Sequence, residues 1–338
     1  MFKHRLLPAI AAASVLLLAG AVSAGPLNTK QVPAKAKWLV HADVKGFLAT
    51  KTGAFVLEEL KKKGLEAVLN NIQEAFAFDV TKDLHSVTVY GRRFAKDAAV
   101  VLLNATLDRE RIAEMLRGNH TYREVKYSGH TIHQWTENPD SDPPGSTKFA
   151  VFHGKDLALM ADRLLLVQEA VDVLDGRGAS LPDRKAKASA KVFLTAFLTE
   201  LPPLGEGKPE GAIFRKIASG QLQAGESQGQ VQAQIAVIAK TAKTAESLRK
   251  LADGVLAFID LASPEGPAGK PAKPGPGVVL DGKPVPPELI AVLKAVTVTL
   301  DGRSVQARAN VPVARATALI RRIIHQNDDA EESQPAEN

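Results

Sequence analysis

The sequence lacks cysteine entirely and contains few aromatic residues. None of its 338 residues is a cysteine, and only 17 are aromatic: 12 Phe, 3 Tyr and 2 Trp. Without a thiol there can be no disulfide framework, no cysteine-ligated zinc or iron–sulfur cluster, and no cysteine nucleophile. The shortage of Trp and Tyr also argues against surfaces that stack on bases or sugar rings. A hydrophobic share of 45% is nevertheless ample for packed cores, and the length suggests about two domains.

The chain also lacks the short motifs of common enzyme classes. It contains no H-E-x-x-H zinc motif, no phosphate-binding loop and no dinucleotide-binding fingerprint. The run Gly225-Glu226-Ser227-Gln228-Gly229 does match the G-x-S-x-G pattern of serine hydrolases. That chemistry requires a helix after the serine and a later histidine, whereas here a strand is expected and the only later histidine is His325. We therefore interpret the match as a polar hairpin turn and assign no catalytic residue.

Two further patterns suggest metal binding but do not fit it. Four histidines lie within 34 residues of sequence: His120, His130, His133 and His153. His130 and His133 are three positions apart on an expected strand, so they point to opposite faces and cannot share an ion. Residues 138–142 have the oxygen spacing of a calcium loop, but Pro143 replaces the required glycine, so we expect only a turn-rich loop. We predict no metal site and no cofactor.

Residues 1–24 have the pattern of a secretory signal peptide. Lys3 and Arg5 precede an apolar run of 17 residues that ends in small side chains. We predict cleavage between Ala24 and Gly25, and then a linker over residues 25–35. An uncleaved membrane anchor is the alternative, which Pro8 and the Ala-rich composition of the run disfavour. No later stretch reaches the length of a membrane span, so we expect an extracytoplasmic protein, periplasmic or secreted, with no membrane span in the mature chain.

Charge is spread along the chain and is not concentrated in one motif. Removal of the signal peptide leaves 41 basic and 37 acidic residues, a net charge of +4. Residues 327–338 contain five acidic side chains and no basic one, so the remaining body carries about +9. This positive body allows binding to anionic polymers of the cell envelope. The basic residues fall in small separated groups, however, which argues against nucleic acid as a partner.

The mature chain carries a repeated order of structural signals. A hairpin followed by a helix is indicated over residues 86–118 and again over 218–260. A second hairpin and helix are indicated over residues 148–174 and again over 295–324. The period-two alternation within these strands is typical of antiparallel sheets with one solvated face.

This repetition predicts an α+β fold of two related halves, each an antiparallel sheet with helices packed on one face. We place the first domain at residues 36–178 and the second at residues 190–326. The second contains an insert over residues 263–287, which holds eight of the 20 prolines. The insert and the acidic tail at residues 327–338 lack the apolar content of a core and are expected to be disordered.

One segment of the first half resembles a known group of proteins. Apolar residues at helical spacing predict a long helix over residues 57–76, and DVTKDL at residues 79–84 then leads into the strand SVTV. An Asp-x-x-Lys-Asp-Leu turn before a Ser-Val-Thr strand, after an Ala-rich signal peptide, resembles a feature of uncharacterised exported bacterial proteins. The resemblance covers the first half well and the second only in plan. It implies an extracytoplasmic α+β domain of unknown function and supplies no catalytic residues.

Together these observations favour a binding role over catalysis. We expect an exported, non-enzymatic protein that binds a partner protein or an apolar ligand in the bacterial cell envelope, on its sheet faces or between its halves. An exported hydrolase that uses carboxylates or His130 and His133 is one alternative, since such sites need no short motif. A binder of anionic envelope polymers is another.

Overall fold

The computed structural model describes residues 27–141, 145–182, 191–199, 213–262, 279–280 and 283–331. The predicted signal peptide, with its cleavage site at Ala24 and Gly25, lies outside these residues, as do residues 263–278 of the insert. Within the described part of the chain, no helix is both long enough and apolar enough to span a bilayer.

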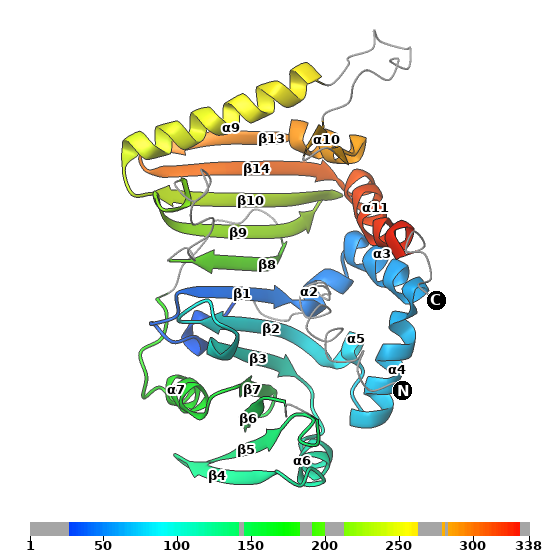
Figure 1. Ribbon diagram of the computed structural model, residues 1–338, viewed down its shortest axis with the longest axis vertical. Coiled ribbons are helices and arrows are strands. Elements are labelled where there is room, and N and C mark those ends of the chain that lie inside the picture. The colour runs from blue at the N-terminus through cyan, green and yellow to red at the C-terminus, as the bar shows by residue number, and fades with distance from the viewer. Residues whose placement is uncertain are drawn as a thin grey trace.

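Twelve antiparallel strands form one continuous sheet (Figure 1). Their order is β13-β14-β10-β9-β8-β1-β2-β3-β7-β6-β5-β4. The strands of the first half are β1 (Trp38–Asp43), β2 (Leu84–Gly91), β3 (Ala99–Ala105), β4 (Arg123–Tyr127), β5 (His130–Thr136), β6 (Thr147–His153) and β7 (Leu157–Ala161). Those of the second half are β8 (Lys191–Leu198), β9 (Ile217–Ser227), β10 (Gln230–Ala239), β13 (Val296–Asp301) and β14 (Ser304–Pro312). A separate small hairpin pairs β11 (Val279–Leu280) with β12 (Lys283–Pro284).

Helices surround this sheet at its ends and on parts of both faces. The first half contains η1 (Thr29–Gln31), α2 (Val44–Leu48), α3 (Lys51–Leu60), η2 (Lys61–Leu65), α4 (Glu66–Phe76), α5 (Val80–Asp83), η3 (Lys96–Ala98), α6 (Arg109–Arg117) and α7 (Leu164–Leu174). The second half contains α9 (Ala242–Ala262), α10 (Pro287–Lys294) and α11 (Val313–Glu331). The predicted long helix is thus a run of three segments, because the chain kinks at Gly64, where φ is 88°.

The structure confirms the predicted α+β class and the four predicted hairpins, but it does not divide into two sheets. The prediction of a separate sheet for each half is wrong because β1 pairs with β2 on one side and with β8 on the other. As edge strands of separate sheets, β1 and β8 would each leave a row of backbone hydrogen-bonding groups unpaired. Their antiparallel pairing satisfies both rows and joins the halves.

The prediction of helices on one face is also wrong for the first half. On one face, Val167 and Val171 of α7 pack against Leu39, Val100 and Leu159 in the main hydrophobic core. On the opposite face, the Arg109 guanidinium of α6 lies 5.8 Å from the centre of the Phe152 ring. The first-half strands carry apolar side chains on both faces, so both faces require cover.

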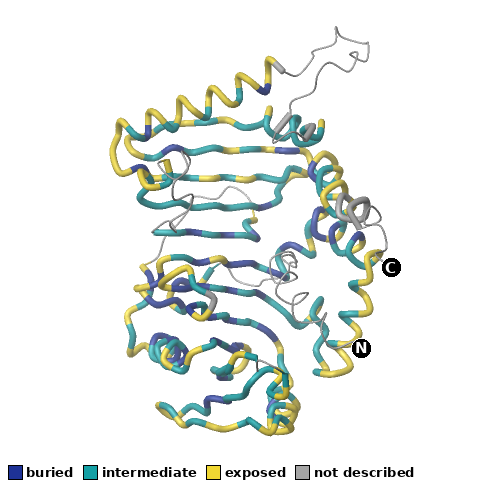
Figure 2. The backbone as a smooth tube through the Cα atoms, viewed as in Figure 1, coloured by how far each residue is buried: buried dark blue, intermediate teal, exposed yellow. Residues whose placement is uncertain are grey.

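In the second half the two faces differ sharply in polarity. The face that continues the α7 side carries polar residues on neighbouring strands: Gln223, Gln234, Arg308 and Thr297. The other face is apolar, and there Ala245 and Leu248 of α9 pack near Val298, Leu300 and Val305. Figure 2 shows the outcome: buried residues are concentrated in β1, β2, β3 and α7, whereas β9, β10, β13 and β14 are mostly half-buried or exposed.

Two side-chain contacts also link the halves at one end of the sheet. The Glu226 carboxylate, at the end of β9, accepts hydrogen bonds of 3.0 Å from the backbone N–H groups of Lys51 and Thr52 at the start of α3. This carboxylate satisfies donors that a helix N-terminus leaves free and complements the helix dipole.

The second contact joins α3 to α11, which lie side by side (Figure 1). Glu59 of α3 is only 3% exposed. Its carboxylate accepts from Lys62 Nζ at 2.6 Å and lies 3.0 Å from Nε2 of His325 and 3.6 Å from Nε of Arg321. The hydrogen bonds from Lys62 and His325 are the main reason that the pKa of Glu59 is lowered to about 2.

We expect Glu226→Ala to lower the free energy of unfolding by about 1 to 2 kcal/mol, because two N-terminal amides of α3 lose their acceptor. Urea unfolding followed by circular dichroism measures the change. Glu246→Ala is the matched control, since Glu246 only pairs with Lys250 on the exposed surface of α9, and its effect should stay within about 0.5 kcal/mol. Equal losses in the two variants would contradict this role for Glu226.

We expect Glu59→Gln to flatten the acid dependence of stability. A carboxyl whose pKa is lowered by folding stabilises the folded state above its ordinary pKa of 4.5, and this contribution is lost as the pH falls towards about 2. Urea unfolding at several pH values should therefore show the difference between wild type and Glu59→Gln shrinking below about pH 4.5. A difference that does not change with pH would contradict this prediction.

Candidate functional site

The structure places the predicted histidines as their spacing requires. His130 and His133 lie on opposite faces of β5, as their spacing predicts. His133 is buried, and its Nδ1 lies 2.8 Å from the Tyr122 hydroxyl, while its ring meets the edge of Phe152. Burial is the main cause that lowers the pKa of His133, which favours the neutral form of this imidazole. His120 lies elsewhere, exposed near Asp140.

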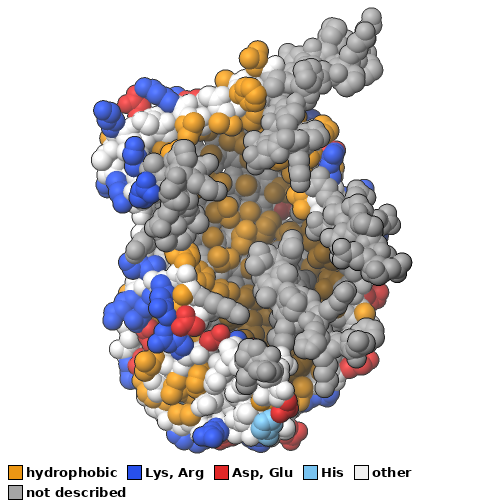
Figure 3. Space-filling view, in the orientation of Figure 1, with side chains coloured by type: hydrophobic (Ala, Val, Ile, Leu, Met, Phe, Trp, Pro, Cys, Tyr) orange, Lys and Arg blue, Asp and Glu red, His pale blue; other side chains and the backbone are white. Residues whose placement is uncertain are grey.

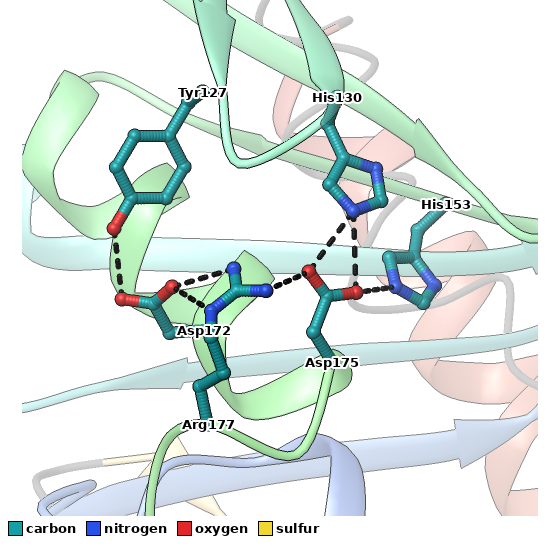
Figure 4. A network of polar contacts seen from close by, with 6 residues as sticks. All are labelled: Tyr127, His130, His153, Asp172, Asp175 and Arg177. Atoms are coloured by element: carbon teal, nitrogen blue, oxygen red, sulfur yellow. Dashed lines mark hydrogen bonds and ion pairs between the residues drawn. The ribbon is translucent and has the colours of Figure 1, made fainter.

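His130 meets a different histidine, His153, on the α7 side of the sheet (Figure 4). The two residues begin β5 and end β6, which are neighbouring antiparallel strands, and their ring centres are 5.1 Å apart. Asp175, at the C-terminal end of α7, reaches both rings. Its Oδ1 lies 2.8 Å from Nε2 of His153, and its Oδ2 lies 3.0 Å from Nε2 of His130.

Arg177 and two further side chains hold this carboxylate in place (Figure 4). Gly176, with a φ of 77°, turns the chain after α7 so that Arg177 comes back over the helix end. Arg177 then bridges Oδ2 of Asp175 and Oδ1 of Asp172, at 2.8 Å each. The Tyr127 hydroxyl donates to the other oxygen of Asp172 at 2.8 Å.

The electrostatics of this cluster favour an ionised Asp175. Burial alone would raise the pKa of Asp175, but hydrogen bonds from His153 and His130 outweigh it, and the pKa lies below its ordinary value. The Arg177 guanidinium is stabilised in its charged form, chiefly by the hydrogen bond to Asp172, which raises its pKa. Chemically, the cluster offers two imidazole nitrogens and one anionic oxygen from three different elements, about one fifth exposed.

Sequence reasoning missed both His153 and Asp175 as partners of His130. One signal for His153 was available: two adjacent antiparallel strands over 130–136 and 147–153 place the first residue of one opposite the last of the other. No local pattern indicates Asp175, because its position depends on how α7 packs across β6 and β7.

The G-x-S-x-G segment is a hairpin turn, as predicted. Gln228 and Gly229 both have positive φ, which is the geometry of a two-residue turn between β9 and β10. Gly225 lies at a bulge where an added Cβ would stand 2.5 Å from the Lys191 carbonyl oxygen. Both glycines therefore have structural reasons for their positions.

Basic residues gather in one groove of about 740 Å³ beside α7. Lys35, Arg92, Arg93, Arg163 and Arg177 line it, although they are far apart in sequence. Acidic side chains pair with most of this charge: Arg92 with Glu169, Arg93 and Arg163 with Asp97, and Arg177 with Asp172 and Asp175. The groove thus has only a small positive excess.

A broad apolar surface lies on the sheet face opposite α7. It spans β3, β2, β1, β8, β9 and β10, and we call it the central apolar face. Three rows of directly paired residues cross these six strands. The middle row is Val101, Val89, Val40, Ala196, Leu222 and Ile235. The row on one side of it is Leu103, Val87, Ala42, Leu194, Ala224 and Ala233. The row on the other side is Ala99, Gly91, Trp38, Leu198, Gly220 and Val237.

The middle of this face is accessible although no polar residue interrupts it. Val40, on a central strand, is 37% exposed, and Ile235 is 47% exposed. Figure 3 shows hydrophobic side chains gathered in a recess at the middle of the molecule. At one margin of the face, Phe47 and Val56 of α2 and α3 pack with Leu194 and Ala224. Among the described residues, helices therefore frame this face and do not cover its middle.

Comparisons with known proteins give limited guidance. No protein-family model matches the chain, and no curated protein sequence does so either. Among solved structures, crystal form III of TP0453 aligns with a TM-score of 0.46 and 7% identity, over 88% of this chain and 99% of that one. Crystal forms I and IV of TP0453 both give TM-scores of 0.43, with 8% and 7% identity, over 89% and 88% of this chain and 98% of theirs. At these values the similarity is no guide to function.

Proposed function

We propose that this protein is an exported binding protein whose central apolar face holds an aliphatic ligand, such as the acyl chain of a lipid. The single observation that carries this proposal is the exposure of Val40 and Ile235 within unbroken apolar rows. The face of an antiparallel sheet that meets water ordinarily carries mostly polar residues, as the opposite face of β10 and β14 does. An apolar patch of this extent is typical of a binding surface.

The chemistry of the face favours an aliphatic ligand over a polar one. Its side chains are those of Val, Leu, Ile and Ala, apart from Trp38, whose indole N–H already donates to the Arg93 carbonyl at 3.0 Å. The backbone groups of these central strands are engaged in the sheet ladders, so a ligand finds no free backbone edge here. Each methylene removed from water contributes about 0.8 kcal/mol, before the entropy cost of fixing the chain.

Export and a duplicated architecture complete the proposal. The signal-peptide pattern of residues 1–24, with cleavage between Ala24 and Gly25, supports an extracytoplasmic location in the cell envelope. The strand order supports an internal duplication: β1-β2-β3-β7-β6 in one half matches β8-β9-β10-β14-β13 in the other. Hairpin β4–β5 has no counterpart in the second half of the sheet. Two copies joined at β1 and β8 would make one apolar face of twice the width.

The test compares two isoleucines of the same strand. Ile235 lies on the central apolar face, whereas Ile238, at 41% exposure, lies three residues on and on the opposite face of β10. We expect delipidated mature protein to bind a fluorescent long-chain fatty acid, and Ile235→Asn to weaken the dissociation constant at least tenfold. Ile238→Asn should change it less than twofold. Fatty-acid titration measures both constants, and tryptophan fluorescence, to which Trp38 and Trp135 contribute, provides a second reading.

Circular dichroism and urea unfolding check that both variants are folded to the same extent. No binding by the wild type, or equal weakening by the two variants, would overturn the proposal. Fatty-acid binding that disappears in about 0.5 M salt would also overturn the proposal, because it would indicate charge contacts with the carboxylate of the fatty acid, which salt screens, and not burial of its acyl chain.

A further inference from the structure

We propose that His130, His153 and Asp175 form a binding site for a divalent transition metal ion of the zinc type. The three side chains belong to β5, β6 and the end of α7, on the face opposite the proposed ligand surface. Nothing in the proposed lipid-binding role requires this site, so the two proposals stand or fall separately.

The donor atoms suit such an ion in kind and in spacing. Imidazole nitrogen and carboxylate oxygen are ordinary zinc ligands, with bonds of about 2.0 to 2.2 Å, so donors around one tetrahedral ion lie about 3.3 Å apart. The ligand atoms of His130, His153 and Asp175 all lie within 4.8 Å of one another. The Nε2 atoms of both histidines lie 2.8 to 3.2 Å from the carboxylate oxygens, close to that spacing. These nitrogens now hydrogen-bond to Asp175, so a bound ion would take the place of the protons between them and the carboxylate.

A second layer of contacts fixes one of the ligands, Asp175. Arg177 donates to one oxygen of Asp175, Asp172 holds Arg177, and Tyr127 donates to Asp172. Such outer contacts orient metal ligands and are a regular feature of metal sites. Arg177 brings a positive charge near the ion. Asp172 and Asp175 each carry a negative charge, so these two aspartates and Arg177 together have a net charge of −1.

One of the three proposed ligands, His153, borders a pocket. His153 lines a pocket of about 380 Å³ together with Asn104, Lys155 and Asp156. Three protein ligands and one open position are the arrangement of zinc sites that bind water or a further molecule.

Titration of the mature protein with Zn²⁺ tests the site directly. The protein is prepared without a polyhistidine tag and stripped with a chelator, and isothermal calorimetry measures stoichiometry and affinity. We expect one ion per chain, and we expect His153→Ala and Asp175→Asn each to weaken binding at least tenfold, because each removes a ligand. The control is His120→Ala, which removes an exposed histidine that lies near Asp140 and is not part of the cluster, and which should leave the affinity unchanged.

Cobalt provides a second measurement that does not depend on heat. Co²⁺ in a site with imidazole ligands gives visible absorption bands, and these should be lost in His130→Ala while circular dichroism remains that of the wild type. Absence of stoichiometric Zn²⁺ binding by the wild type would overturn the proposal. An equal loss in His120→Ala would do so as well, since it would indicate general binding by surface histidines.

Discussion

The backbone pairing between β1 and β8 is the contact on which the rest of the structure depends. It joins two groups of strands into one sheet and pairs the backbone N–H and C=O groups that the edge strands of separate sheets would leave unpaired. It also aligns Val40 with Ala196, so the apolar rows of the two halves become continuous. A shift of this register by one residue would turn the apolar side chains of β8 to the polar face. The contacts of Glu226 and Glu59 then fix the halves at one end of the strands.

Much of the fold could be predicted from sequence because its units are local. The hairpins follow from alternation and turn residues, such as Asp301 and Gly302, whose effects act over a few positions. The union of the halves could not be predicted in this way, since β1 and β8 are about 150 residues apart and their pairing leaves no local pattern. For the same reason, the sequence did not indicate that apolar residues of six strands would align in rows.

The candidate sites show the same difference between what local patterns predict and what depends on long-range packing. Spacing alone placed His130 and His133 on opposite faces, and it identified the G-x-S-x-G segment as a turn. Grouping His130 with His153 requires the register of β5 and β6, and adding Asp175 requires the docking of α7. Prediction therefore succeeded where one element decides the outcome and failed where a site is assembled from three.

The unequal burial of the two halves has a thermodynamic consequence. The first half packs apolar side chains on both faces of its strands, whereas β9 and β10 have one polar face and one that is only framed by helices. The second half thus has the smaller reserve of buried surface and should open first in local unfolding. A ligand bound over Leu222 and Ile235 would bury more apolar surface in the second half. Ligand binding would therefore stabilise the second half against local unfolding. In that sense the bound ligand would act as a missing layer of the core.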